Sequence, residues 1–336
     1  MSKVNSKTVL EYIWIGGNGE LRSKTRVIHS NIPLKQFEIP NWNYDGSSTN
    51  QADSNKNTEV ILSPCSIFKN PLSSISDCDS YLILCDTYDI NEQPIPTNTR
   101  NRANEIFEQD KSQIPWFGLE QEYFMVHFKM GADCRLTTEG QFYCGTQLNT
   151  IERNIAEEHL KACLEAGIQI SGINAEVAKS QWEFQVGPCE GIEAGDHLYV
   201  ARFLLERIAE KYGVSICYKP KMGLHQNGSG CHTNFSTLKM RNKEGIKHIF
   251  ECMEKLENKH KEHIQVYGKD NEKRLTGKHE TSSIDKFSYG VGTRNTSVRI
   301  PNQTFKDSCG YFEDRRPAAN MDPYLVTSTI FKTCCL

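Results

Sequence analysis

The sequence predicts an α+β protein in which a small strand-rich region comes before a larger region of mixed strands and helices. Two observations support this class. Over roughly the first 90 residues, short apolar stretches alternate with turn-forming residues, which is typical of strands joined by tight turns. After a polar segment with two prolines at 91–98, helical patterns with capping residues alternate with strand-like runs.

The first region contains three apolar runs that are predicted to be strands. They lie at residues 12–15, 60–62 and 81–85. Glycine, asparagine and aspartate residues separate these runs and are expected to form turns. The polar segment 91–98 is expected to be a linker, which divides the chain into domains at 6–92 and 99–336.

The second region contains four predicted helices and three predicted strands. The helices are expected at residues 151–166, 196–212, 245–263 and from Asp322-Pro323 onward; the strands are expected at 116–126, 181–186 and 297–300. Gly167 and Gly213 follow the first two helices and are expected to end them. Asp196 is expected to cap the second helix, and Pro323 to occupy the first position of the last.

The composition is that of a soluble globular protein, with 38% hydrophobic residues, 24% charged residues and a net charge of -3. This charge balance argues against a generally basic surface that binds nucleic acid. No apolar run approaches the roughly 18–20 residues that span a bilayer, and no apolar signal-peptide core follows the first residues. We therefore expect a cytoplasmic protein that does not associate with membranes.

Thirteen cysteines are scattered along the chain, and no Cys-x-x-Cys pair occurs. In a reducing compartment such residues are mostly small buried apolar side chains. Cys334 and Cys335 are expected to be the most exposed of them.

Two glutamates stand out because they lie within an apolar run. In a strand, Glu120 and Glu122 would point to the same face. Two adjacent carboxylates on a buried face are costly unless a cation or hydrogen-bond donors compensate them. Mg²⁺ and Mn²⁺ prefer oxygen ligands, so one interpretation is a metal site. The other is an edge strand with a solvated acidic face.

A second acidic element has the same character. Glu183 lies between aromatic residues in the predicted strand at 181–186. Glu190 follows a Gly-Pro turn, where a loop at a strand end can direct a side chain into a cleft. An ordinary polar turn is the simpler alternative.

Three further segments carry residues suited to binding. Arginines beside acids at 310–317 either form a surface ion-pair cluster or bind phosphate and carboxylate groups. The glycine-rich stretch 227–236 contains His232, which is either a ligand or a satisfied core residue. The polar segment 274–285 is either a lid over a site or an ordinary charged loop.

Several common motifs are absent from the sequence. It has no phosphate loop of the Gly-x4-Gly-Lys-Ser/Thr type, no dinucleotide-binding Gly-x-Gly-x-x-Gly after a strand and no zinc-protease His-Glu-x-x-His. If ATP binds, metal ions and arginines must therefore hold its phosphates.

Taken together, these segments resemble glutamine synthetases of the eukaryotic type. The resemblance covers nearly the whole chain in order and rests on residues 12–15, 42–49, 115–123, 174–177, 181–191, 227–236, 274–281, 294, 299–301 and 310–317. It implies a β-grasp N-terminal domain and a catalytic domain with a curved antiparallel sheet flanked by helices. It also implies a homodecamer of two pentameric rings with active sites between subunits. The implied reaction is the ATP-dependent amidation of L-glutamate with ammonia through γ-glutamyl phosphate, a ligase reaction of glutamine biosynthesis.

The resemblance also implies a role for each matching residue. One ion, Mg²⁺ or Mn²⁺, is expected at Glu122, Glu183 and Glu190, and the other at Glu120, His232 and Glu313. ATP is expected beside Trp116, Glu120, Glu190, Asn234, Phe235, Ser236, Arg294, Arg299 and Tyr311. Glutamate is expected beside Asn227, Gly228, His232, Arg274, Arg294 and Arg315. The expected catalytic residues are Arg294, Arg315, Glu280 of a closing flap, and Asp45 offered by an adjacent subunit.

Three places depart from the family pattern. His225-Gln226 replace an Asn or Asp followed by Trp beside the glutamate pocket, Lys221 replaces an apolar residue, and 128–154 is shorter and more polar than usual. Three rival interpretations are considered at this point. One is a related γ-glutamyl-amine ligase, and another is a catalytically silent structural member of the fold. The third is an unrelated guanidino kinase, which would also use arginines around ATP but has no use for paired metal-binding carboxylates.

Overall fold

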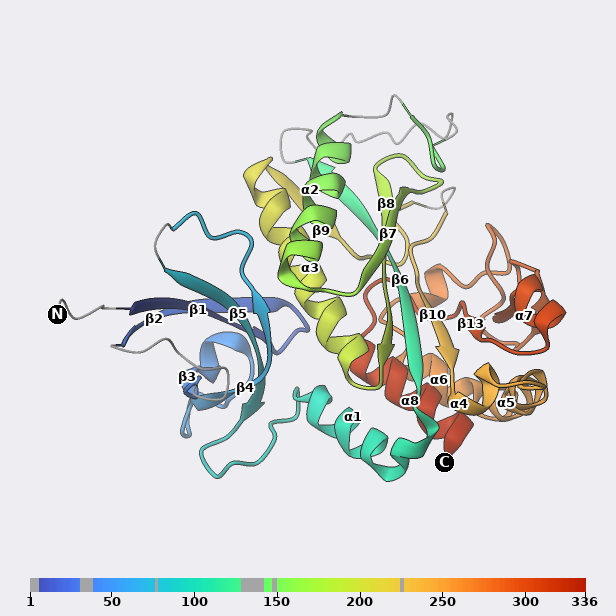
Figure 1. Cartoon of the computed structure of the whole chain (residues 1–336), viewed down its shortest axis with the longest axis horizontal. Helices are drawn as coiled ribbons and strands as arrows, with labels where there is room; N and C mark the ends of the chain where they lie inside the picture. Colours follow the sequence, from blue (N-terminus) through green and yellow to red (C-terminus); the bar gives the residue numbers. More distant parts are fainter. Residues whose placement is uncertain (1–5, 31–38, 76–77, 128–141, 147–149, 224–226) are drawn as a thin grey trace.

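The computed structural model describes residues 6–30, 39–75, 78–127, 142–146, 150–223 and 227–336 (Figure 1). A five-stranded sheet forms from the N-terminal part of the chain, and an eight-stranded sheet from the remainder. In Figure 1 the N-terminal sheet stands to one side, and long helices lie between it and the larger sheet. The α+β class predicted from the sequence is confirmed.

The N-terminal sheet is mixed, with strand order β2-β1-β5-β4-β3. The strands are β1 Ser6–Ile15, β2 Leu21–Ser30, β3 Trp42–Asp45, β4 Glu59–Lys69 and β5 Asp79–Tyr88. Strands β1 and β5 are parallel, and the other pairs are antiparallel. All three strands predicted for this region are confirmed.

Alternation along β1 gives this sheet two apolar faces. Ile13 and Leu82 belong to the main core of the molecule, whereas Tyr12 and Trp14 belong to a smaller core on the opposite face. The main core therefore continues from the N-terminal sheet into the rest of the chain.

A buried polar contact also joins the two regions. Arg100 lies in α1 (Thr99–Phe107), just after the predicted linker, and α1 is followed by the 3-10 helix η3 (Glu108–Gln113). The Arg100 guanidinium donates to both carboxylate oxygens of Asp196 at 2.8 and 2.9 Å, and to Asp86 of β5 at 3.1 Å. This contact fixes the N-terminal sheet against a helix of the larger region.

The larger sheet has the order β11-β12-β13-β10-β6-β8-β7, with β9 paired to β6. Its strands are β6 Trp116–His127, β7 Ile170–Ala175, β8 Gln181–Glu190, β9 Val214–Cys217, β10 Cys231–Ser236, β11 Tyr289–Val291, β12 Val298–Ile300 and β13 Phe312–Asp314. Only β11 and β12 are parallel among these pairs. The strands predicted at 116–126, 181–186 and 297–300 are confirmed as β6, β8 and β12.

Helices cover one face of this sheet. The helices nearest the sheet are α2 Thr150–Ala166 and α3 Glu193–Lys211. The other helices of this region are α4 Leu238–Arg241, α5 Ile246–Asn258, α6 His260–Val266, α7 Asn302–Asp307 and α8 Pro323–Cys335, with the short 3-10 helix η4 Asn271–Lys273. The 3-10 helix η2 Gly46–Thr49 follows β3 in the N-terminal region. In Figure 1, α2 and α3 lie on the side of β6 and β8 that faces the N-terminal sheet. The buried side chains of Leu119, Tyr123 and Phe184 belong to the core between helices and sheet.

Four sequence predictions about helices have different outcomes. Gly213 has a φ of 65° just after α3, and Pro323 occupies the first position of α8, as predicted. The side chain of Asp322 caps α8. Asp196 does not cap α3, because the helix already begins at Glu193 and Asp196 is buried within its first turn, bound to Arg100. The prediction of a single helix over 245–263 is wrong, because two helices, α5 and α6, are separated at Lys259.

The prediction for the last cysteines is also wrong. Cys334 is buried and Cys335 is half-buried, because α8 packs into the main core. Among the described residues, no helix combines the length and apolar character needed to cross a membrane.

Candidate active site

Strand register places the predicted acidic residues on one face of the larger sheet, opposite the helices. Glu122 of β6 lies directly across from Glu183 of β8. Glu120 lies across from Gln185 of β8 on one side and from His232 of β10 on the other. Residues opposite one another in adjacent strands share a face, so these side chains meet although they are far apart in the sequence.

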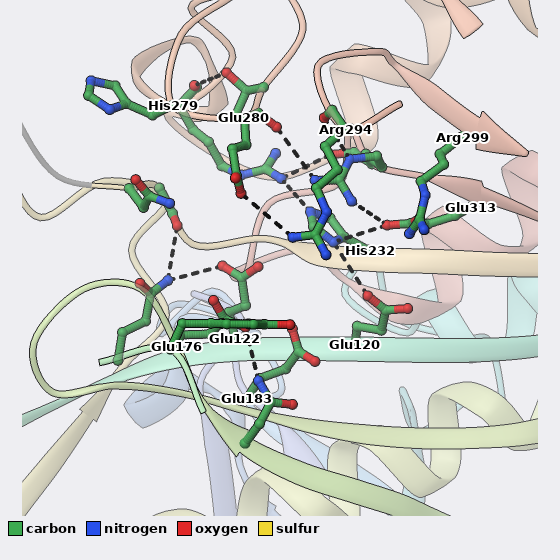
Figure 2. A pocket seen from close by; sticks show the side chains of 18 residues that line it. Glu120, Glu122, Glu176, Glu183, His232, His279, Glu280, Arg294, Arg299 and Glu313 are labelled. Atoms are coloured by element: carbon green, nitrogen blue, oxygen red, sulfur yellow. Dashed lines mark hydrogen bonds and ion pairs between the residues drawn. The ribbon is translucent and has the colours of Figure 1, made fainter. Parts of the chain in front are cut away.

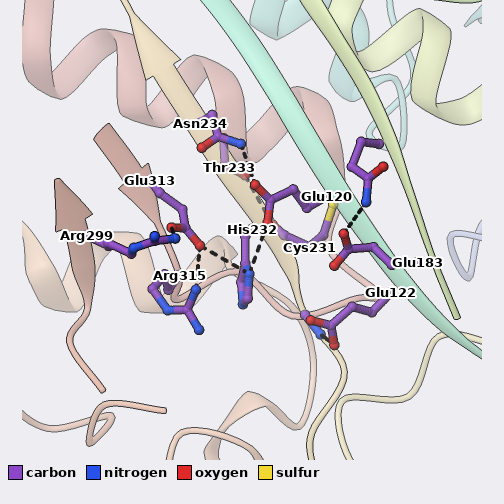
Figure 3. A network of polar contacts seen from close by, with 12 residues as sticks. Glu120, Glu122, Glu183, Cys231, His232, Thr233, Asn234, Arg299, Glu313 and Arg315 are labelled. Atoms are coloured by element: carbon purple, nitrogen blue, oxygen red, sulfur yellow. Dashed lines mark hydrogen bonds and ion pairs between the residues drawn. The ribbon is translucent and has the colours of Figure 1, made fainter. Parts of the chain in front are cut away.

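Glu120, His232 and Glu313 form one potential metal-binding group, which we call the histidine group (Figure 3). One ligand atom from each lies within 4.8 Å of the others. The Nδ1 atom of His232 is 3.5 Å from a Glu120 oxygen and 3.4 Å from a Glu313 oxygen. Burial, and then the charge of Arg315, hold the pKa of His232 well below its usual value. A neutral imidazole beside two carboxylates is a suitable ligand set for a divalent cation.

Two arginines contact the histidine group from the side of Glu313. Arg299 Nη1 lies 3.1 Å from Glu313 Oε2, and Arg315 donates to the other carboxylate oxygen. The side chain of Glu313 is only 3% exposed. Its negative charge is therefore balanced by cations of the protein itself.

Glu122, Glu176 and Glu183 form a second group, which we call the triglutamate group (Figure 2). Burial raises the pKa of Glu122, and the charge of Glu176 raises it further. Burial also raises the pKa of Glu183, followed by the charges of Glu122 and Glu120. Burial is the main cause of both shifts and neighbouring carboxylates add to it, although Arg274 and Arg315 lower the pKa of Glu122. A hard divalent cation would relieve such buried, adjacent carboxylates.

The structure does not bring Glu190 to the triglutamate group. Glu190 lies exposed at the end of β8, across from Trp116, and does not line the cavity that contains Glu122 and Glu183. Glu176, which follows β7, occupies that place. Residues 176, 183 and 190 are seven apart in sequence, so spacing alone could not distinguish Glu176 from Glu190.

One cavity contains both groups and the residues predicted to bind glutamate. The predicted residues that line it are Glu120, Glu122, Glu183, Asn227, Gly228, His232, Arg274, Glu280, Arg294, Arg299, Glu313 and Arg315. The cavity also has lining residues that were not predicted, namely Tyr143, Asn174, Glu176, Gln181, His279 and Thr281. His225-Gln226 lie outside the described residues, as does most of the 128–154 segment.

Arg274 is buried beside His232, and two glycines leave room for its side chain. A Cβ atom at Gly228 would lie 2.6 Å from the Arg274 side chain, and one at Gly230 would lie 2.5 Å from it. The guanidinium donates to the backbone carbonyl of Arg315 at 2.9 Å and lies 3.1 Å from Nε2 of His232. The glycine-rich stretch thus makes room for an arginine.

The predicted lid segment runs along the cavity. His279 and Glu280 both have left-handed backbone conformations, with φ values of 54° and 61°. The Glu280 carboxylate lies 3.9 Å from Arg294 Nη1, and its carbonyl accepts from Arg315 at 3.5 Å. In Figure 2, Glu280 and Arg294 face each other on the side of the cavity opposite Glu122 and Glu183.

A second cavity adjoins the first and shares Glu120 with it. Its lining includes the predicted nucleotide-side residues Trp116, Asn234, Phe235, Ser236 and Tyr311. Arg241, which was not predicted, stacks 3.9 Å from the centre of the Trp116 ring. An apolar, aromatic cavity that meets a carboxylate-rich one can hold a ligand with a flat ring at one end and anionic groups at the other.

Asp45 lies away from both cavities of its own chain. It is the last residue of β3, is exposed, and accepts hydrogen bonds from the Ser47 and Ser48 hydroxyls at 2.8 and 2.6 Å. These hydrogen bonds, that of Ser48 foremost, lower its pKa to about 2, so the carboxylate is ionised.

Comparisons with known proteins point in one direction. The sequence model of the glutamine synthetase catalytic domain matches residues 96–252. A protein of Acanthamoeba polyphaga mimivirus, provisionally named a glutamine synthetase, is 53% identical over 98% of this chain and 95% of its own length. The glutamine synthetase nodule isozyme of Lupinus luteus is 49% identical over 100% of this chain and 97% of its own length. The chloroplastic glutamine synthetase of Daucus carota is 49% identical over 98% and 78%, respectively.

Proposed function

We propose that this chain, which belongs to the glutamine synthetase family, is a ligase that joins ammonia to the γ-carboxylate of L-glutamate using ATP. The observation that carries the proposal is the pair of adjoining cavities. One gathers carboxylates, two histidines and four arginines, the other is aromatic, and they meet at Glu120.

The chemistry explains why both cavities are needed. A carboxylate is a poor acylating agent, so the γ-carboxylate of glutamate is first converted to γ-glutamyl phosphate by ATP. We assign the aromatic cavity, with Trp116 and Tyr311, to the nucleotide ring. The carboxylate-rich cavity then receives the phosphates and the glutamate.

We propose that divalent cations, Mg²⁺ or Mn²⁺, bind at the histidine group and the triglutamate group. The donor chemistry fits, because carboxylate oxygens and a neutral imidazole are the available ligands. In the triglutamate group, burial and like charges outweigh the effect of the arginines on Glu122. Glu176 replaces the predicted Glu190 in this assignment. When bound, the ions neutralise charge on the phosphoryl oxygens.

The arginines supply the remaining positive charge. We assign Arg294 and Arg299 to the ATP phosphates, and Arg274 and Arg315 to the glutamate carboxylates and the transferred phosphoryl group. Glu280 is positioned to close the cavity, which keeps water from the acyl phosphate. Ammonium must lose a proton to become a nucleophile, and we propose that the ionised Asp45 of a neighbouring subunit helps to take it.

This role for Asp45 requires an assembly in which subunits share sites, and we propose the homodecamer of two pentameric rings. The separation of Asp45 from both cavities of its own chain supports that proposal. The domain limits at 6–92 and 99–336 remain part of the proposal. The cytoplasmic location also stays a prediction, because one of the relatives is named for the chloroplast.

The test is ammonium dependence. Purified protein with Mg²⁺, ATP and L-glutamate should release phosphate only when ammonium is added, and should form glutamine in equal amount. Product formed with another amine but not with ammonium would select a γ-glutamyl-amine ligase. No turnover at saturating substrates would select a silent member of the fold.

A further inference from the structure

Each carboxylate of the triglutamate group accepts a hydrogen bond from a neutral side-chain amide. Gln181 donates to Glu122 at 3.1 Å, and Asn174 donates to Glu176 at 3.0 Å. Gln185 donates to Glu183. The histidine group differs at Glu313, which is held by arginines, although its Glu120 also accepts a hydrogen bond from an amide, that of Asn234, at 2.8 Å.

Two of these amides are joined to each other. The Nε2 atom of Gln185 also donates to Oδ1 of Asn174 at 2.7 Å. The chain of contacts therefore runs from Glu183 through Gln185 and Asn174 to Glu176. We call Asn174 and Gln185 the amide bridge.

The sheet is built to accommodate this bridge. Asn174 of β7 lies across from Glu183 of β8, and Gly172 lies across from Gln185, so all four share one face. A Cβ atom at Gly172 would lie 2.6 Å from Oε1 of Gln185. A side chain at position 172 would therefore displace the Gln185 amide, and glycine leaves room for it.

We infer that Asn174 and Gln185 are positioning residues that fix the orientation of Glu183 and Glu176 for a divalent cation. This inference rests on the proposed function, since it assumes that the triglutamate group binds the ion. Neutral amides orient carboxylate oxygens without cancelling the negative charge that attracts the cation, whereas arginines would compete with it. Partners of this kind typically contribute about 10–100-fold to metal affinity.

The experiment measures Mn²⁺ binding to the purified full chain by electron paramagnetic resonance of the free ion, without substrates. Gln185→Met and Asn174→Leu keep the approximate side-chain volume and remove the amide. Each should weaken one class of Mn²⁺ sites by about 10–100-fold. The Mn²⁺ affinity of the double variant should lie within about threefold of that of the weaker-binding single variant, because either change breaks the same bridge.

Two further variants separate positioning from general damage. Gly172→Ala keeps both amides but displaces Gln185, and it should weaken the same class of sites. Gln113→Leu removes another glutamine amide, which donates to Asp110 at 2.7 Å outside the cavity, and should leave Mn²⁺ binding unchanged. Thermal melting without metal shows whether each variant folds.

Glu183→Gln distinguishes a failure of the inference from a failure of the proposed function. It should abolish the same class of Mn²⁺ sites. If it does so while the bridge variants bind Mn²⁺ as the wild type does, the positioning role is refuted and the metal assignment stands. If Glu183→Gln leaves binding unchanged, both the metal assignment and the positioning role are refuted.

Discussion

The two carboxylate groups of the cavity lie side by side on one sheet face, yet their charges are handled differently. In the histidine group, Glu313 is contacted by Arg299 and Arg315. In the triglutamate group, the side-chain donors to the three carboxylates are neutral amides. Burial, and then the charges of neighbouring carboxylates, raise the pKa values of these glutamates. The first group is close to balanced without an ion, and the second depends on one.

The largest expected effect concerns which glutamate completes the triglutamate group. Glu176→Gln preserves shape but removes a charge that faces Glu122 and Glu183, and glutamine formation should fall more than about 100-fold. Glu190→Gln changes an exposed side chain outside that group and should retain activity within about threefold. Steady-state assays at saturating Mg²⁺ make the comparison. The opposite ranking would restore Glu190 as the ligand.

The second prediction is that two substitutions change the stability of the metal-free protein in opposite directions. Without metal, Glu183→Gln should stabilise the protein by about 1–3 kcal/mol, because it relieves crowding of buried like charges. Glu313→Gln should destabilise it by a similar amount, because two arginines lose their carboxylate partner. Calorimetric melting in a chelator measures both. If the two variants shift the melting temperature in the same direction, the two groups do not differ as described.

A pH dependence should also separate the groups. The pKa values of Glu122 and Glu183 are raised above 4.5 in the folded chain, so the native state binds more protons than the unfolded one. Stability of the metal-free protein should therefore fall as the pH rises above about 4.5 toward those raised values. A cation must displace these protons, so affinity at the triglutamate group should rise up to about tenfold per pH unit for each proton displaced.

The histidine group should not show this rise above neutral pH. The pKa of His232 lies well below its usual value, so its imidazole is already neutral there. Mn²⁺ titrations at three pH values between 6.5 and 8.5 measure both classes of sites. Equal pH dependence of the two classes would contradict the contrast.

The smallest expected effect comes from Arg299→Lys. The side chain keeps its charge but loses the planar guanidinium that contacts Glu313 at 3.1 Å. We expect the KM for ATP to rise about three- to tenfold, with kcat changed less than twofold and Mn²⁺ binding at the triglutamate group unaffected. An unchanged KM would mean that Arg299 does not serve the nucleotide.

Local patterns predicted the elements that carry the site. The apolar run around Glu120 and Glu122 identified β6, and alternation identified the face of these glutamates. The break at Lys259 was not predicted, because no glycine or proline interrupts residues 246–263. The role of Asp196 was also missed, since its partner Arg100 is distant in sequence and is brought near only by packing.

The partners of the carboxylates could not be derived from the sequence because they depend on register. Asn174, Gln181 and Gln185 are ordinary polar residues until β7 and β8 are aligned. A shift of one residue would turn them to the helix-covered face. Glu176 lies in 174–177, one of the segments that resemble the family, but its position beside Glu183 depends on how β7 and β8 are aligned.

Glu120 belongs to the histidine group and also lines the aromatic cavity. On the proposed assignment, a cation and a nucleotide would be neighbours of the same side chain. Binding of the cation and binding of the nucleotide are then thermodynamically linked. If the cation increases the affinity for the nucleotide by some factor, the nucleotide increases the affinity for the cation by the same factor. Asn234, which donates to Glu120 at 2.8 Å and lines the aromatic cavity, would be part of that thermodynamic coupling.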